Sequence, residues 1–182
     1  MRTKLIDLVC AGLLLSGGVA LADQSPAPTK QHESSDREFL DKALGVNQLE
    51  LQLGQLAARR ATTADVKAMG AKMVEKHTEL GKQLADLSRQ AGGTGEAALT
   101  SDQRATYDRV ASQSGSALDS MFKEVVDAGH VDELAMYRDE VGRAKSSALR
   151  ALAQRRVTKL EETVAQAKAP AAKPKAEPKQ DW

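Results

Sequence analysis

The chain has one cysteine in 182 residues, and that cysteine, Cys10, lies in an N-terminal leader. Without the leader the chain can form no disulfide, and it offers neither a thiolate metal ligand nor a cysteine nucleophile. Aromatic residues make up only 3% of the sequence, too few for the stacking platforms that bind single-stranded nucleic acid. An excess of charge is also missing, because 26 Lys and Arg stand against 25 Asp and Glu. We therefore predict no nucleic-acid partner.

Residues 1–22 have the pattern of a cleaved signal peptide. A short basic start precedes an apolar run over residues 8–19, and Ala20-Leu21-Ala22 supplies the small residues that signal peptidase accepts. The apolar run is shorter than the roughly 20 residues that a membrane-spanning helix needs. We expect cleavage before Asp23, no transmembrane anchor after cleavage, and a periplasmic or secreted protein.

Two other segments lack any helical or strand periodicity. Residues 23–34 are polar and contain two prolines, which predicts a flexible linker. Residues 169–182 are rich in Pro, Ala and Lys, which predicts a disordered tail. The lysines of this tail suggest an anionic envelope polymer or an envelope protein as a partner, but a solvated tail is the simpler interpretation. The sequence leaves the partner unknown.

Residues 35–168 show the repeat of amphipathic helices and form the predicted domain. Capping boxes at Ser35, Thr100 and Ser116, together with glycines and a proline, divide them into helices at about 35–60, 63–89, 100–112, 116–141 and 146–167. No segment alternates long enough to form a strand. The sequence predicts an all-α, ferritin-like antiparallel four-helix bundle with a short helical insert between the second and third long helices.

Two histidines of this domain lie within apolar stripes. His77 continues a row of Val66, Met69, Met73 and Leu80, and His130 continues a row of Phe122, Val126, Leu134 and Tyr137. The spacings of three and four place both histidines on inward helix faces. Glu50 lies in a similar row of the first helix, although a parallel row of leucines leaves the orientation of that helix open. In the last helix we expect a solvated face at Arg150, Arg155, Arg156 and Lys159.

The order of these features resembles one family, the exported DUF4142 domain of unknown function. The matching segments are FLDKALGVNQLELQLGQLAARRATTADVKAMGAKMVEKHTEL, SGSALDSMFKEVVDAGHVDELAMYRDE and ALRALAQRRVTKLEETVAQA, which cover most of residues 39–167. The resemblance implies a ferritin-like fold, an extracytoplasmic location and no established chemistry. It also implies that Glu50, His77, Asp119 and His130 match shared positions. The family's last helix commonly has a Leu-Pro step and another histidine, where this chain has Val157-Thr158 and Thr163.

A ferritin-type di-iron site needs Glu-x-x-His pairs, because ligands three residues apart project to the same side of a helix. Asp127-x-x-His130 has this spacing. The second pair is incomplete, because Val74 occupies the position of the carboxylate before His77. The spacing therefore argues against a di-iron oxidase.

The inward residues leave two interpretations. A transition metal ion can be held by the candidate ligands His77, His130, Glu50 and Asp127, and Met69 and Met73 would add soft ligands. The interpretation that the sequence favours is a buried polar cluster, in which the histidines pair with Glu50, Asp119 or Asp127.

The chain has no Gly-x-Ser-x-Gly elbow and no glycine-rich phosphate loop after a strand. We therefore predict that it is not an enzyme and needs no cofactor. The favoured function is an exported, non-enzymatic binding, structural or stress-related module. The alternative is a metal-binding or redox bundle that uses the inward His, Glu and Asp residues.

Overall fold

The computed structural model describes residues 30–168, with side chains from residue 35 onward. Every regular element in this range is a helix: α1 Lys30–Arg60, α2 Ala64–Gln90, α3 Ser101–Ala111, α4 Gly115–Arg143 and α5 Ser147–Lys168. The prediction of an all-α fold is confirmed for these residues. The predicted signal peptide, residues 23–29 of the linker and the tail lie outside the described range. None of the five helices is both long and apolar enough to cross a membrane.

Local capping explains where several helices begin. Thr100 caps α3 in the predicted capping box: its backbone N–H donates to Gln103 Oε1 at 2.9 Å, and the Gln103 N–H donates to Thr100 Oγ1 at 3.2 Å. Helix α1 starts at Lys30, before the predicted cap Ser35. Residues 30–34, which the sequence placed in the linker, are therefore helical.

The capping box predicted at Ser116 would use Asp119, three residues later, but helix α4 begins at Gly115 after Ser114, and the Asp119 carboxylate contacts the turn between α1 and α2. The backbone N–H groups of Thr62 and Thr63 donate to Asp119 Oδ1 and Oδ2, each at 2.8 Å. The Thr63 hydroxyl donates to the same carboxylate, also at 2.8 Å. This side chain therefore joins α4 to the first turn of α2, and it is not the partner of either histidine.

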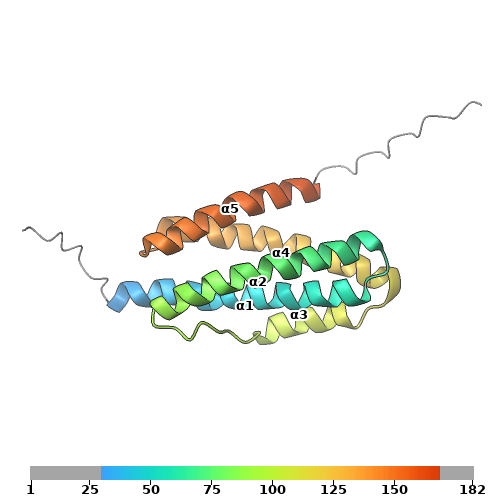
Figure 1. Ribbon diagram of the computed structural model, residues 1–182, viewed down its shortest axis with the longest axis horizontal. Helices are drawn as coiled ribbons and strands as arrows, with labels where there is room; N and C mark the ends of the chain where they lie inside the picture. The colour runs from blue at the N-terminus through green and yellow to red at the C-terminus, as the bar shows by residue number, and fades with distance from the viewer. Residues whose placement is uncertain (1–29, 169–182) are drawn as a thin grey trace, which may run out of the picture.

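The helices pack as two antiparallel pairs, α1 with α2 and α4 with α5, and α3 lies along α1 and α4 (Figure 1). Two apolar clusters fill the interior. One includes Leu40, Leu84, Tyr137 and Leu149, and the other includes Leu53, Val66, Met73 and Phe122. On α1, α2 and α4 the residues between these clusters are polar and buried, and they include Asn47, Glu50, His77, His130 and Glu133. The core is thus divided by a polar layer.

Glycines allow α1 and α2 to approach closely. A Cβ atom on Gly70 would lie 2.6 Å from the Ala58 backbone nitrogen and 2.7 Å from the Gly54 carbonyl oxygen. These are backbone atoms, so the clash can be relieved only by separating the two helices. The tight α1–α2 pair fixes the spacing between Glu50 on one helix and His77 on the other.

Gly70→Ala is expected to lower the free energy of unfolding by about 2–3 kcal/mol, because the added methyl group overpacks a backbone contact. Gly129→Ala in α4 is the matched control, since a Cβ there meets no atom within 4 Å. The control should gain about 0.5–1 kcal/mol from higher helix propensity. Urea unfolding followed by circular dichroism measures both variants, and an equal response would contradict the close approach.

Candidate metal centre

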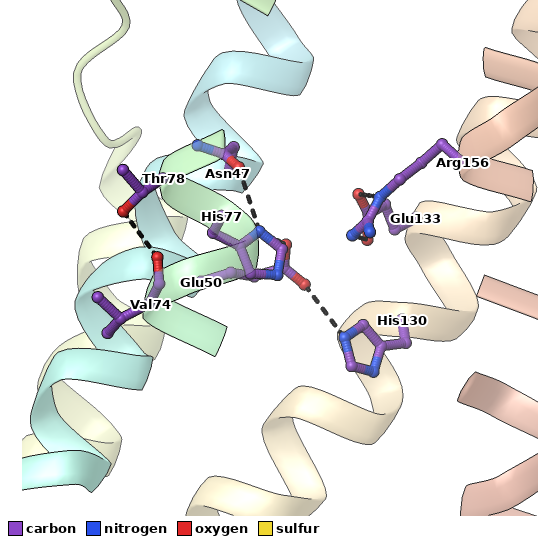
Figure 2. Close-up of polar contacts among 8 residues, drawn as sticks. All are labelled: Asn47, Glu50, Val74, His77, Thr78, His130, Glu133 and Arg156. Carbon is purple, nitrogen blue, oxygen red and sulfur yellow. Dashed lines mark hydrogen bonds and ion pairs between the residues drawn. The ribbon is translucent and has the colours of Figure 1, made fainter. Parts of the chain in front are cut away.

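Three side chains from three helices converge in the polar layer. Glu50 comes from α1, His77 from α2 and His130 from α4, and all three are buried (Figure 2). His77 Nδ1 lies 3.3 Å from Glu50 Oε2, and His130 Nε2 lies 3.8 Å from Glu50 Oε1. One ligand atom from each residue lies within 4.8 Å of the others. Two imidazoles and a carboxylate therefore face one common point.

Asn47 fixes the orientation of the His77 ring. Its Oδ1 lies 3.1 Å from His77 Nδ1, and an amide oxygen only accepts hydrogen bonds, so Nδ1–H is the donor. In the neutral ring the proton then sits on Nδ1, which is also the ring atom 3.3 Å from Glu50 Oε2. Nε2 carries the free lone pair and is the atom that His77 would offer to an ion. A hydrogen bond on one ring nitrogen that leaves the other for a metal is the arrangement found around ligating histidines.

Both histidines are neutral at physiological pH. Burial, with the nearby Arg156 charge as the next cause, lowers the pKa of His77 to about 3 and that of His130 to about 4. Metal binding to imidazole requires the neutral ring, which acid otherwise protonates. The interior therefore keeps both rings in the form that donates a lone pair.

Glu50 is the least satisfied group of the layer. Its Oε1 and Oε2 are both buried, and neither accepts a hydrogen bond from any residue that the structure describes. Burial raises the pKa of Glu50 well above its ordinary value, the Glu133 carboxylate raises it further, and Arg156 opposes this shift. A buried carboxyl group without partners costs free energy. A cation placed between Glu50 and the two imidazoles would remove that cost.

The neighbouring carboxylate, Glu133, has its own partner. Arg156 of α5 donates from Nε to Glu133 Oε1 at 3.0 Å and from Nη2 to Oε2 at 2.7 Å, a bidentate pair that is mostly buried. Figure 2 shows this pair beside His130, with the guanidinium directed inward. The pair holds α4 to α5 and leaves Glu50 as the carboxylate of the layer without a fixed partner.

A cavity of about 340 Å³ opens beside His77 and His130. Residues of α2, α4 and α5 line it, among them Met69, Met73, Asp127, Arg156 and Leu160. The cavity supplies a route from the surface to the two imidazoles, so an ion bound there would keep a side open to ligands from outside.

The predicted ligands divide into two groups. Glu50, His77 and His130 come together. Asp127 is exposed and lines the rim of the cavity, and it is not one of the three converging groups. Met69 and Met73 line the cavity wall next to His77 rather than the cluster itself.

Two functional residues were missed by the sequence analysis, Arg156 and Asn47. Arg156 was assigned to a solvated face, yet its side chain is 14% exposed. A signal for it existed, because Arg156 is four residues from both Leu152 and Leu160, which are buried on the same helix. Asn47, three residues before Glu50, was assigned to no helix face, although it lies three residues after Leu44 and four before Leu51 in the parallel row of leucines.

The spacing of the three ligands is somewhat wide for a bound ion. Zinc bonds of about 2.0–2.2 Å hold ligand atoms roughly 3–3.6 Å apart, whereas the farthest of these atoms are up to 4.8 Å apart. Rotation of the His130 ring, which has an unpartnered Nδ1 among the described residues, can shorten the gap. The three ligand atoms must therefore move slightly closer to one another when an ion binds.

Acid is expected to destabilise the metal-free protein through the histidines. The folded pKa values of about 3 and 4 lie below the unfolded value of 6.5. Below about pH 6.5 the unfolded chain therefore binds more protons than the fold, and stability falls as pH falls. In His77→Gln the slope of unfolding free energy against pH, between about pH 5 and 6, should decrease by about 1.2 kcal/mol per pH unit. Urea unfolding in chelator tests this, and an unchanged slope would mean that folded His77 already carries a proton.

Comparisons with known proteins agree with this architecture. The domain described as "Domain of unknown function (DUF4142)" matches residues 21–169. No functionally curated protein matches the sequence. Among solved structures, a DUF305 protein from Streptomyces coelicolor that is described as secreted superposes with a TM-score of 0.64 at 11% identity, covering 74% of this chain and 89% of that chain. At this identity the likeness shows the fold alone.

Proposed function

The chain belongs to the DUF4142 family, a domain of unknown function, and we propose that it binds one divalent transition metal ion between Glu50, His77 and His130. The observation that carries the proposal is the Glu50 carboxyl group. It is buried without a hydrogen bond from the described residues, and two neutral imidazoles lie beside it.

The donor set indicates the class of ion. Imidazole nitrogen suits zinc, copper, iron and nickel, and two histidines with one carboxylate leave coordination positions open for other ligands. The Asn47 contact on His77 Nδ1 supplies the outer hydrogen bond that holds a ligating ring in place. The bound ion would bring redox or Lewis-acid chemistry, whereas the chain's own residues orient it and limit access. We assign binding and no reaction.

The architecture supports the same proposal. We propose that α1, α2, α4 and α5 are the long helices of a ferritin-like four-helix bundle and that α3 is the insert. Bundles of this type build metal sites from side chains on facing helices, and three such helices supply the ligands here. We also propose an exported location. The leader pattern of residues 1–22 supports it, as does the likeness in fold to a protein described as secreted.

The test is metal titration of the chelator-treated protein. Isothermal titration calorimetry with Zn²⁺ and Cu²⁺ should give one site per chain, and His77→Ala should lose it. Asp127→Asn is the matched control, because Asp127 carries an acidic group at the cavity rim outside the three ligands, and it should keep the site. Loss of helical content in His77→Ala is checked by circular dichroism, and Glu50→Gln serves as the second ligand variant.

Two results would count against the proposal. If the wild type binds no ion with a stoichiometry of one, the cluster is the buried polar layer that the sequence analysis favoured. If Asp127→Asn loses the ion and His77→Ala keeps it, the ion lies at the rim and not in the cluster.

A further inference from the structure

Positively charged side chains dominate the charged lining of the cavity beside the metal centre. Lys72 and Lys76 of α2, Lys123 of α4 and Arg156 of α5 line it, against one carboxylate, Asp127. The three lysines are exposed, so they surround the mouth, while Arg156 lies deeper. Since the chain as a whole is nearly neutral, this local excess of positive charge is a property of the cavity.

The deeper wall does not cancel this charge. His77 and His130 are neutral rings there, and Arg156 is paired with Glu133, so the uncompensated charge of the cavity is that of the three lysines against Asp127. Field lines from several like charges are concentrated where a concave surface limits solvent, so such a cavity attracts ions of opposite sign. Lysine ammonium groups donate up to three hydrogen bonds each and are common ligands of phosphate-like anions.

The same charges oppose the entry of a bare metal dication. An ion bound at Glu50, His77 and His130 would lie near four cationic side chains, against which the carboxylates of Glu50, Asp127 and Glu133 stand. The site would then keep a net positive charge after a dication is bound. A dianion in the cavity would reduce this repulsion. It would also reach the coordination positions that three protein ligands leave open on the ion.

We propose that this cavity binds a small tetrahedral oxyanion, of the class of sulfate or hydrogen phosphate, between the lysines of its mouth and the metal centre. The volume of about 340 Å³ accepts such an anion with several waters and lies at the small end of ligand cavities. The binding of the anion by the lysines is argued from the lining of the cavity alone. Its role as a ligand of the metal ion rests on the proposed function. Anion and metal then bind with positive coupling, each raising the affinity for the other by the same factor.

Sulfate is the probe, titrated into the full chain at constant ionic strength set with sodium chloride, with and without Zn²⁺. Amide chemical shifts report binding and should change in residues around the cavity. Lys76→Gln and Lys123→Gln should each weaken sulfate binding roughly threefold, and the double variant roughly tenfold, as expected for partly screened charges. Lys67→Gln, an exposed lysine of α2 outside the cavity, should leave the affinity unchanged.

The outcomes separate the two proposals. Sulfate binding to the metal-free protein that Lys76→Gln weakens supports the cavity, whatever the metal does. Sulfate binding that Lys67→Gln weakens equally, or no sulfate binding in either state, overturns it. Zn²⁺ binding with an affinity that sulfate does not change keeps the metal centre and overturns the role of the anion as its ligand. Failure of Zn²⁺ to bind with or without sulfate overturns the metal centre.

Discussion

Arg156→Met is expected to lower the free energy of unfolding by about 3–5 kcal/mol. The substitution leaves the Glu133 carboxylate, whose side chain is 2% exposed, without its bidentate partner. The carboxylate must then either lose its charge or remain ionised in the interior, and both cost free energy. Urea unfolding at neutral pH in chelator measures the loss.

The same helices supply the control. Arg138 of α4 pairs with Glu161 of α5 at 2.7 Å, but both side chains are about half exposed. Arg138→Met should therefore cost less than about 1 kcal/mol. The double variant Glu133→Met/Arg156→Met should recover most of the stability lost in Arg156→Met, because no charge is left buried. A loss of similar size in Arg138→Met would show that burial does not set the cost.

The sequence was sufficient for the order of the helices and for the inward position of the two histidines. An inward face repeats every three or four residues, so His77 and His130 could be placed in the core from their neighbours alone. The Thr100 cap of α3 could also be predicted, since its partner Gln103 is three residues away. Both predictions depend only on residues a few positions apart, so a short segment of sequence is enough to make them.

The contacts between helices could not be predicted in the same way. Periodicity gives the face of a residue but not its height along the bundle, so the meeting of Glu50 with both histidines depended on unknown helix registers. The close Gly54–Gly70 approach, which sets the α1–α2 register, becomes visible only in three dimensions. Asp119 illustrates the same limit. Its position three residues after Ser116 favoured a local cap. The backbone N–H groups of Thr62 and Thr63, in a distant turn, donate to its carboxylate instead.

Arg156 shows a second reason for error. Arginine is usually exposed, and four basic residues close together in the last helix indicated a solvated face. The long side chain nevertheless follows the apolar surface inward to a carboxylate on α4. The spacing from Leu152 and Leu160 indicates the inward face of Arg156, but the sequence of α5 does not indicate its partner on α4.

Glu50→Met is expected to make the metal-free protein more stable, by about 1–3 kcal/mol, while abolishing its stabilisation by zinc. Glu50 is buried and makes no hydrogen bond with the described residues, so methionine removes a desolvation cost and little else. A residue kept for metal binding need not stabilise the fold without the metal. A structural hydrogen-bond partner must do so, and this difference separates the two interpretations of the cluster.

With zinc bound, the wild type should become more stable than Glu50→Met. A ligand that binds only the folded state stabilises it by about 2.7 kcal/mol at a free concentration one hundred times its dissociation constant. The wild type should gain this amount, and Glu50→Met should gain none, because one of three ligands is missing. Thermal unfolding with chelator and then with zinc measures both states in each protein.

The same substitution at Glu133 is the control, because it lies in the same layer but in a satisfied pair. Glu133→Met leaves the mostly buried Arg156 guanidinium without its carboxylate, so it should destabilise the metal-free protein even though Glu50→Met stabilises it. Opposite signs from one substitution at two buried glutamates would show that Glu50 is held in place for something other than stability. If both variants lose stability and zinc does not stabilise the wild type, Glu50 is a structural partner of the histidines and the metal centre is wrong.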